Sequence, residues 1–591
     1  MSPFRLAFPA FLAMSTLAMA PAIAQQASDQ VQPETATAPT IVTAGEPVRA
    51  DLEMVVTANP LATKAGLDVL QRGGTAADAI VAIQAVLGLV EPQSSGLGGG
   101  AFLVHFDAAS GKVSTIDGRE TAPMAATGKL FQKADGQPMD FFSAVVGGRS
   151  VGVPGTVRLL ELAHQRHGKL EWASLFDPAI TLANDGFAVS PRLSCLIAAD
   201  LKRISSEPSA AAYFLDSAGQ PLKAGAILKN HDYALTLQAI AQAGANAFYA
   251  ESIADRIIDA VKLHPGNPGL LTIEDMKAYK AIERDVVCLP YRGYEVCGMG
   301  PPSSGALTIG QILGMVEGFD LRTLGPDDPV SWRIIGDATR LAFADREAYM
   351  ADSDFVRVPA GLLDGAYLKD RANLIARDTA LPKEAVKAGD PPWDKAELRL
   401  PGLDISLPST SHFTVVDRWG NVASVTSSIE NGFGSRQMAA GFLLNNQLTD
   451  FSFVPTGQDG TAVANRVEPG KRPRSSMSPT IILKDGKPVH ALGSPGGSRI
   501  IPYVAKTIIA LIDWDMNMQQ AVALPHLVNR FGTYDIEAGT AAEALGPDLE
   551  AMGFEVAIRE LNSGLHGISI ATDGTITGGA DPRREGLAAG N

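Results

Sequence analysis

The chain is poor in basic segments, and this shortage narrows the range of partners. Its 591 residues carry a formal net charge of −15, with 49 Lys and Arg against 64 Asp and Glu. No basic block offsets this balance, which argues against nucleic acid as a partner because binding to phosphates needs clustered positive charge. A large surface for anionic lipid is disfavoured for the same reason.

Metal and nucleotide motifs are also lacking. The three cysteines and nine histidines form no cluster with zinc-ligand spacing, and neither His-Glu-x-x-His nor a phosphate loop occurs. Residues 96–101, Gly-Leu-Gly-Gly-Gly-Ala, fit the dinucleotide fingerprint, but they follow a predicted helix and open a predicted strand, the reverse of the required order. We expect no metal and no cofactor, and interpret these glycines as a tight turn or a close backbone approach.

The N-terminal segment is typical of a secretory signal peptide. A charged start is followed by an apolar run over residues 6–20 and by Ala22-Ile23-Ala24, a small-x-small cleavage pattern. The run is short for a membrane span, and no later stretch approaches about 18 uninterrupted apolar residues. We expect residues 1–24 to be removed, residues 25–48 to form a flexible leader, and the protein to be periplasmic or secreted.

Hydrophobic periodicity divides the remainder of the chain into two parts. Helical patterns cover residues 59–90, most of residues 154–279, and residues 327–349. Residues 382–409 are rich in proline and charge, which predicts an exposed linker. Behind it the period changes to two. We therefore expect a part over residues 49–409 and a strand-rich part over residues 410–591, with strands at residues 412–417, 422–428, 480–483 and 488–492.

Two of the cysteines face each other in a predicted hairpin. Residues 286–299 read as two strands that turn at Arg292-Gly293. Counting outward from a two-residue turn places Cys288 opposite Cys297 at a non-hydrogen-bonded pair, where Cα atoms are close. A disulfide and two buried free thiols both fit this spacing.

Thr410 stands where the two parts meet, within Ser409-Thr410-Ser411-His412. A Thr at the start of a strand is often no more than a good β-former. A Thr that becomes the first residue of a cleaved fragment, however, gains its own base, because the freed α-amine can take the proton of its hydroxyl. Placed behind a linker, Thr410 indicates a self-cleaving amidohydrolase or acyl transferase that is cut between Ser409 and Thr410.

Polar residues after Thr410 supply what acyl transfer needs. The amides of Gly496 and Gly497 can point at one oxyanion. Ser475 and Ser476 can hydrogen-bond a carboxylate, and residues 445–450, Asn-Asn-Gln-Leu-Thr-Asp, offer amides and an anion for an ammonium group. Each of these groups also has an ordinary structural interpretation, as a turn glycine, a capping serine or a loop amide.

The motifs around these residues, taken in order, resemble the γ-glutamyltransferases, which are N-terminal-nucleophile hydrolases. The resemblance extends from about residue 43 to the C-terminus. It implies an α/β fold, a four-layer αββα sandwich formed jointly by a heterodimer of two fragments from one precursor. The matching segments are residues 117–123, 151–156, 301–305, 410–417, 443–451, 472–480 and 493–500.

The resemblance also implies catalytic roles. Thr410 matches the nucleophile, at the start of the small catalytic fragment. Gly496 and Gly497 match the glycines of the oxyanion hole. Ser428 falls where the family usually has a second Thr that supports the nucleophile, and it keeps the hydroxyl.

Further positions match the family's substrate-binding residues. Arg119 matches the Arg that holds the substrate α-carboxylate, a task suited to a bidentate guanidinium fork. Ser475 and Ser476 match the serines on the same carboxylate, and Gln447 and Asp450 match groups around the α-amine.

The chain departs from the family at two places. Glu430 occupies a position where typical members have an amide side chain near the substrate amine, so its carboxylate could strengthen ammonium binding or alter selectivity. This segment also resembles the cephalosporin-acylase-like branch, whose substrates carry glutaryl or related groups. Residues 452–470, where many members have a lid with an aromatic gate, contain no Tyr or Trp, which predicts an acyl site more open to water.

The sequence therefore predicts a small-molecule enzyme. We expect a γ-glutamyl hydrolase and transferase that acts on glutathione and related amides and passes the acyl group to water, an amino acid or a peptide. One alternative is a glutaryl or cephalosporin-type acylase on the same fold. The other is an uncleaved, inactive protein that binds γ-glutamyl compounds.

Overall fold

The structure is a computed structural model that describes residues 45–375, 378–392 and 409–591. The predicted signal peptide, residues 25–44 of the predicted leader and residues 393–408 of the predicted linker lie outside the described residues. The first described strand is β1 (Val48–Ala50), which starts at the last residue of that predicted leader. Among the described helices, none is both long enough and apolar enough to cross a bilayer.

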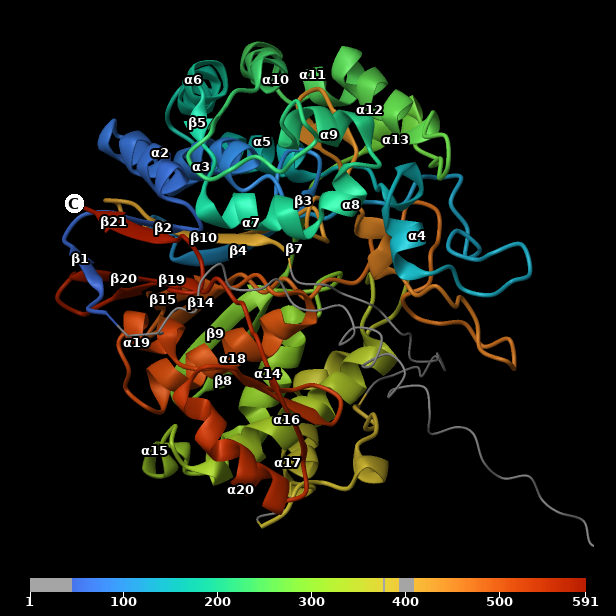
Figure 1. Ribbon diagram of the computed structural model, residues 1–591. Helices are drawn as coiled ribbons and strands as arrows, with labels where there is room; N and C mark the ends of the chain where they lie inside the picture. Colours follow the sequence, from blue (N-terminus) through green and yellow to red (C-terminus); the bar gives the residue numbers. More distant parts are fainter. Residues whose placement is uncertain (1–44, 376–377, 393–408) are drawn as a thin grey trace, which may run out of the picture.

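Two seven-stranded sheets lie face to face at the centre of the molecule (Figure 1). Their strand orders are β21-β2-β10-β11-β3-β4-β7 and β1-β20-β19-β15-β14-β9-β8, and neighbouring strands are antiparallel. The first sheet contains β2 (Met54–Thr57), β3 (Gly100–Asp107), β4 (Lys112–Gly118), β7 (Ile282–Arg284), β10 (Ser411–Val416), β11 (Val422–Ser428) and β21 (Leu587–Gly590). The second contains β1, β8 (Val286–Tyr291), β9 (Tyr294–Met299), β14 (Thr480–Lys484), β15 (Lys487–Gly493), β19 (His566–Ile570) and β20 (Ile576–Ala580).

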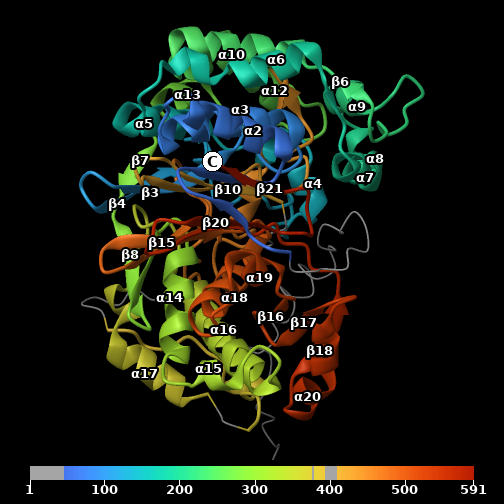
Figure 2. The same ribbon diagram turned by 90° about the vertical axis from the view of Figure 1, so that its left-hand side faces the viewer.

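Helices cover the outer face of each sheet (Figures 1 and 2). The four layers make the αββα sandwich that the resemblance implied. Over the first sheet lie α2 (Pro60–Gln71), α3 (Ala76–Val90), α5 (Thr156–His167), α6 (Asp177–Asp185), α10 (His231–Ala243), α12 (Ser252–Lys262) and α13 (Ile273–Ala278). Over the second lie α14 (Gly305–Val316), α16 (Pro329–Tyr349), α17 (Gly365–Asn373), α18 (Ile500–Ile512), α19 (Met518–Ala523) and α20 (Gly546–Ala551).

Shorter elements complete the fold. A three-stranded sheet flanks the second helical layer, and its strands are β16 (Leu527–Asn529), β17 (Thr533–Glu537) and β18 (Glu555–Arg559). Two-stranded pairs are formed by β5 (Phe187–Ala188) with β6 (Ile227–Leu228), and by β12 (Met438–Ala439) with β13 (Phe442–Leu443). The short helices are α4 (Phe141–Val145), α7 (Pro191–Ala199), α8 (Leu201–Ile204), α9 (Pro208–Phe214), α11 (Asn246–Ala250) and α15 (Leu321–Leu324).

Strand β3 shows why the chain forms layers. Successive side chains of a strand point to opposite faces. Ala101 and Leu103 accordingly belong to the core under the first helical layer, whereas Phe102 and Val104 belong to the core shared by the two sheets and the second helical layer. A strand that is apolar on both faces has to be covered on both, which a second sheet and a helical layer accomplish.

Helices are present in the predicted segments, although residues 59–90 form two of them, α2 and α3, and α16 begins at Pro329. Thr75 caps α3 with a capping box, in which its Oγ accepts from the Asp78 N–H and the Asp78 carboxylate accepts from the Thr75 N–H. Every residue of α3 is buried, as expected for a helix that is apolar all round. The long helix α16 begins with Pro329 in its first turn, where the missing N–H has no partner to lose.

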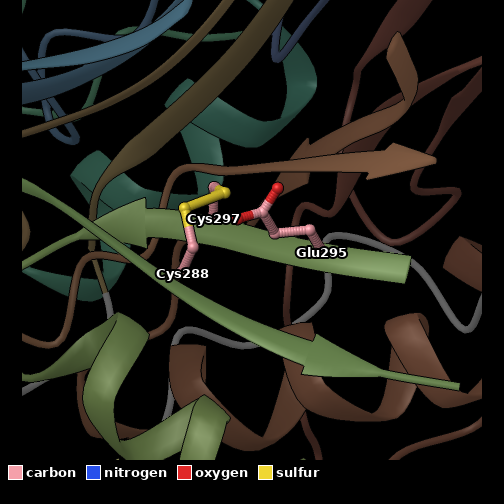
Figure 3. A group of neighbouring side chains, drawn as sticks. All are labelled: Cys288, Glu295 and Cys297. Atoms are coloured by element: carbon pink, nitrogen blue, oxygen red, sulfur yellow. A yellow bond between two sulfur atoms is a disulfide. The ribbon is translucent and has the colours of Figure 1, made fainter. Parts of the chain in front are cut away.

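The predicted hairpin is also present, and it settles the state of two cysteines. Strands β8 and β9 pair Cys288 with Cys297, whose Cα atoms are 4.1 Å apart and whose sulfurs are bonded. Arg292 and Gly293 form the turn with φ of 51° and 80°, as a two-residue hairpin requires. Glu295 lies beside the disulfide (Figure 3). Because both sulfurs are in the disulfide, Cys288 and Cys297 offer no thiolate that could bind a metal beside Glu295.

Both large sheets combine strands from the two predicted parts of the chain. In the first sheet, β10 and β11 lie between β2 and β3. In the second, β14 pairs with β9, and β20 pairs with β1. A cut before Thr410 would therefore leave both fragments within one shared hydrophobic core.

Candidate active site

The predicted site residues meet in one pocket. All of them line it except Ser409 and Gly496. Met477 and Ile500 also line it, although neither belongs to a chemical motif; they follow directly on Ser476 and on the 3-10 turn that Gly497 opens. The lining residues are Arg119, Thr410, Ser428, Glu430, Gln447, Asp450, Ser475, Ser476, Met477, Gly497 and Ile500.

Thr410 lies immediately before β10 and faces the end of β11. The ladder pairs Ser411 with Ser427, which brings Thr410 alongside Ser428. The Thr410 hydroxyl donates to Ser428 Oγ at 3.0 Å, and Ser428 Oγ accepts from the Glu430 N–H at 2.9 Å. Ser428 is thus held by the backbone and in turn orients the Thr410 hydroxyl.

The backbone at Thr410 is strained. Its φ is 127°, a value that L side chains rarely adopt and that costs most for a β-branched residue. Ser409 is fully buried, and its hydroxyl donates to the Gln93 carbonyl at 2.8 Å. The prediction of an exposed linker is therefore wrong at its last residue, because the predicted cleavage bond is packed into the fold.

His412 is not positioned to serve Thr410 as a base. Its Nδ1 lies 2.9 Å from Thr426 Oγ1 and its Nε2 lies 3.1 Å from Thr414 Oγ1, so both ring nitrogens are engaged. Burial, with a smaller effect from His566, holds the pKa of His412 well below its ordinary value, so the ring is neutral. A cut before Thr410 would instead free an α-amine on the same residue as the hydroxyl, which can take its proton.

Arg119, which follows β4, is fixed from several sides. Its Nη2 contacts Asp450 Oδ2 at 2.5 Å and donates to the Arg474 carbonyl at 3.0 Å, while its Nε donates to the Pro473 carbonyl at 3.2 Å. Gln447 Nε2 donates to the same Asp450 oxygen at 2.7 Å. The guanidinium and the carboxylate thus stand side by side at one end of the pocket.

A buried arginine supports the paired serines. Arg346 of α16 donates to Ser476 Oγ at 2.9 Å and to Ser304 Oγ at 2.9 Å, and Ser304 donates to the Ser475 carbonyl at 2.7 Å. Because Ser476 Oγ accepts from Arg346, its own proton is available to an anion in the pocket. Sequence reasoning missed Arg346, since it lies far from the serines along the chain and belongs to no local motif.

Glu430 adds a second carboxylate to the pocket wall. It is 3% exposed and has a φ of 76°. Asn446 donates its amide N–H to Glu430 Oε2, and the Asn446 carbonyl oxygen accepts from the Asn431 N–H at 2.9 Å. Glu430 and Asp450 together make this side of the pocket suited to an ammonium group.

The glycine pair leads into a helix. Gly496 and Gly497 have φ of 136° and 58°, and the 3-10 turn Gly497–Arg499 continues into α18. Main-chain N–H groups at a helix N-terminus favour negative charge. Gly497 lines the pocket, whereas Gly496 is not among the lining residues, and a Cβ added to it would come within 2.9 Å of the Tyr503 ring.

The glycine run before β3 acts as a close contact, as predicted. A Cβ added at Gly98 would lie 2.1 Å from the Leu443 carbonyl oxygen, and one at Gly99 would lie 2.1 Å from that of Ser428. The run follows α3 and opens β3, which is not the order of a dinucleotide-binding turn. It instead lets the chain pass directly behind the residue that orients Thr410.

Residues 452–470 carry one aromatic ring, and it does not line the pocket. Phe453 stacks on Phe131 with ring centroids 4.6 Å apart, and neither is among the lining residues. The sequence interpretation noted the missing Tyr and Trp but overlooked Phe453. Its ring is committed to a satellite apolar cluster rather than to the site.

Comparisons with known proteins agree on one family. The gamma-glutamyltranspeptidase family model matches residues 62–591. The chain is 38% identical to a glutathione hydrolase proenzyme of Bacillus subtilis (strain 168) over 91% of each chain. It is 35% identical to an acylase ACY 1 proenzyme of Pseudomonas sp. (strain V22), over 92% of this chain and 94% of the acylase. A crystal structure of cephalosporin acylase from Bacillus halodurans superposes with a TM-score of 0.81 at 25% identity, covering 95% of this chain and 99% of the acylase.

Proposed function

The chain belongs to the gamma-glutamyltranspeptidase family, and on that premise we propose that it is a self-processed enzyme that cleaves γ-glutamyl amides such as glutathione. The acyl group passes to Thr410 as an ester and then to water, an amino acid or a peptide. The observation that carries this proposal is the Thr410 hydroxyl, oriented by Ser428 at 3.0 Å on the wall of a pocket that also holds a guanidinium and two carboxylates.

The pocket is suited to the two charged groups of a γ-glutamyl substrate. Arg119 and the hydroxyls of Ser475 and Ser476 form the end that would bind the α-carboxylate. Asp450 and Glu430 supply the opposite charge for the α-ammonium group. Arg119 and Asp450 are already paired. The substrate would bind beside this ion pair, with its carboxylate next to Arg119 and its ammonium group next to Asp450.

The chemical step uses the residue's own backbone nitrogen. The Thr410 Oγ–C bond forms at the γ-carbonyl while the free α-amine of Thr410 takes the hydroxyl proton. The oxyanion is stabilised by main-chain N–H groups at Gly496 and Gly497, at the start of α18. When the intermediate collapses, the C–N bond breaks and the amine leaves with the proton. Water or an amine then attacks the ester along the same route in reverse.

Maturation follows from the same geometry. We infer cleavage of the Ser409–Thr410 bond by the Thr410 hydroxyl, favoured because the cut releases the strained φ of 127°. The relatives named as proenzymes support such a step. The signal-peptide pattern of residues 1–24 supports export, and we propose a periplasmic or secreted enzyme.

Two measurements test the proposed function together. On a denaturing gel the purified protein should give two bands, and N-terminal sequencing of the smaller should read Thr-Ser-His-Phe. The processed protein should release the amine from a chromogenic γ-glutamyl amide. One uncut band without hydrolysis would instead support an inactive protein that binds γ-glutamyl compounds.

A glutaryl or cephalosporin-type acylase is the second candidate. It is favoured by the similarity to the acylase structure and by the lack of Tyr and Trp in residues 452–470. A glutaryl amide lacks the α-amine, so it would bring no cation to Glu430 and Asp450. A higher kcat/KM for a glutaryl amide than for the matched γ-glutamyl amide would replace the first candidate with this one.

A further inference from the structure

Arg584 contacts the backbone of the proposed nucleophile. Its Nη1 donates to the Thr410 carbonyl oxygen at 3.0 Å, and the two residues are 6% and 4% exposed. Arg584 lies in the connection between β20 and β21, far from Thr410 along the chain. We propose that Arg584 is a positioning residue that orients Thr410 and, through its charge, keeps the freed α-amine in its basic form. This inference rests on the proposed function.

The packing leaves the Arg584 side chain little freedom. A Cβ added at Gly564 would lie 2.7 Å from Arg584 Cδ and 2.8 Å from Pro495 Cγ. The arginine stem therefore passes through space that only a glycine leaves open, next to the residue that precedes Gly496. Across Gly564, the Arg584 side chain lies near the segment that carries the oxyanion glycines, and it contacts the carbonyl of the nucleophilic residue directly.

The turn that presents Arg584 is held by its neighbour Asp581. The Asp581 carboxylate accepts from the N–H groups of Gly564 and Leu565 at 3.0 Å each and from the Arg583 N–H at 2.9 Å. Arg583 also pairs with Asp581 at 3.0 Å and with Glu537 at 2.5 Å. Arg583 is thereby committed to structural ion pairs, and the guanidinium that reaches Thr410 is that of Arg584.

Elementary electrostatics gives this contact a chemical consequence. The carbonyl and the α-nitrogen belong to the same residue, so a guanidinium bonded to one lies within a few ångströms of the other. A nearby positive charge disfavours protonation of an amine. The reaction needs the amine unprotonated, since its lone pair takes the hydroxyl proton. The hydrogen bond also fixes the Thr410 carbonyl and with it the direction of the adjacent amine and side chain.

The other titratable groups described around Thr410 are paired, hydrogen-bonded or neutral. On the pocket side, Arg119 is paired with Asp450, and Glu430 is bound by Asn446. The imidazoles of His412 on β10 and His566 on β19 are neutral, because burial lowers the pKa of His566 to about 4 and that of His412 well below its ordinary value. All of these groups stay the same when Arg584 is replaced, so a replacement isolates the guanidinium.

The test is a pair of variants, Arg584→Gln and Arg584→Lys, with Arg322→Gln as the matched control. Arg322 likewise donates to a main-chain carbonyl, that of Ile512 at 2.8 Å, away from the pocket. For each processed protein, kcat/KM on a γ-glutamyl amide is measured from pH 5 to pH 10. Arg584→Gln should lower kcat/KM at pH 7 about tenfold. It should also shift the acidic limb of the pH profile of kcat/KM to higher pH by about one unit. Arg584→Lys and the control should keep the wild-type limb.

Each result bears on the inference. An Arg584→Gln enzyme with an unmoved acidic limb overturns it, as does an Arg584→Lys enzyme whose limb moves equally far. If Arg584→Gln stays uncut while Arg584→Lys matures and keeps its limb, the positioning role is supported; an uncut Arg584→Lys overturns it. A wild-type protein that cleaves no γ-glutamyl amide would sink the proposed function instead, so the two failures are distinguishable.

Discussion

The parts of the chain before and after the Ser409–Thr410 bond contribute very differently to the site. Among the described residues that line the pocket, only Arg119 comes from the first part, and all the others come from the second. Yet the first part supplies most of the helical cover and flanks both β10 and β11. The chemistry is concentrated in one part, whereas the packing is divided between the two.

This difference explains why a cut chain can remain one enzyme. In the second part alone, β10 and β11 would still pair with each other, but the outer edge of each strand would be unpaired. The first part supplies β2, β3 and the Arg346 guanidinium that supports Ser476. A cut at the Ser409–Thr410 bond would remove one covalent link and leave the shared sheets and cores intact.

Removal of the nucleophile should have the largest effect on the enzyme. Thr410→Ala should remain one chain and lose at least about 10³-fold in kcat, because both cleavage and acyl transfer use the same hydroxyl. Thr410→Ser keeps the hydroxyl and is the control, expected to mature. A cleaved, active Thr410→Ala protein would contradict the mechanism.

Glu120 tests what the first part contributes to stability. It is fully buried beside Arg119, and neither carboxylate oxygen meets a hydrogen-bond partner in the described part of the protein. Burial raises the pKa of Glu120 from 4.5 to about 8. Between those values the unfolded state ionises first, so folding stability should fall as pH rises from 4.5 to 8, by on the order of 3–5 kcal/mol.

The matched variant is Glu120→Gln, which keeps the shape and cannot ionise. It should resemble the wild type near pH 4.5 and be more stable near pH 8, as measured by thermal unfolding at both values. Parallel loss of stability in the two proteins would mean that Glu120 is ionised or paired in the folded state.

Arg119 tests the one substrate contact that the first part provides. Arg119→Lys keeps the charge but loses the fork that reaches Asp450 and the carbonyls of Pro473 and Arg474. We expect kcat/KM to fall about 10²-fold, or about 2.7 kcal/mol, with maturation preserved because cleavage does not use the substrate carboxylate. Unchanged kinetics would reduce Arg119 to a structural charge.

Glu430 tests a substrate contact that the second part of the chain provides. Glu430→Gln removes the charge and keeps the shape. It should therefore lower kcat/KM more for γ-glutamyl substrates, which carry an α-amine, than for glutaryl substrates, which do not. A charged partner of this kind contributes about 1.5–3 kcal/mol when fully engaged. Since Asp450 shares the ammonium, we expect the lower end, about a tenfold change in the ratio of the two kcat/KM values.

The controls for Glu430 lie in the same experiment. Both amides are measured on both proteins, and maturation is followed on a gel. Equal loss on the two substrates would show that Glu430 does not contact the amine. A loss confined to the glutaryl amide would favour the acylase as the function of this site.

Local pattern was sufficient for much of the fold. The apolar run of α3, the two-residue turn at Arg292-Gly293 and the alternation in β3 each have a cause within a few neighbouring residues. The face-to-face placement of Cys288 and Cys297 followed from counting alone, but the bond between them did not. The burial of Ser409 was not predictable, because a proline-rich segment gives no sign of where its last residue packs.

The sequence by itself determined which chemical groups this protein possesses: a Thr behind a linker, paired serines, paired glycines, and the motifs of one family. Only the tertiary structure decided which distant groups act on them. The hydrogen bonds from Arg584 to Thr410 and from Arg346 to Ser476 join residues far apart in the chain. Such contacts arise when packed layers bring segments together, and a long side chain's partner is set by that packing rather than by its neighbours in sequence.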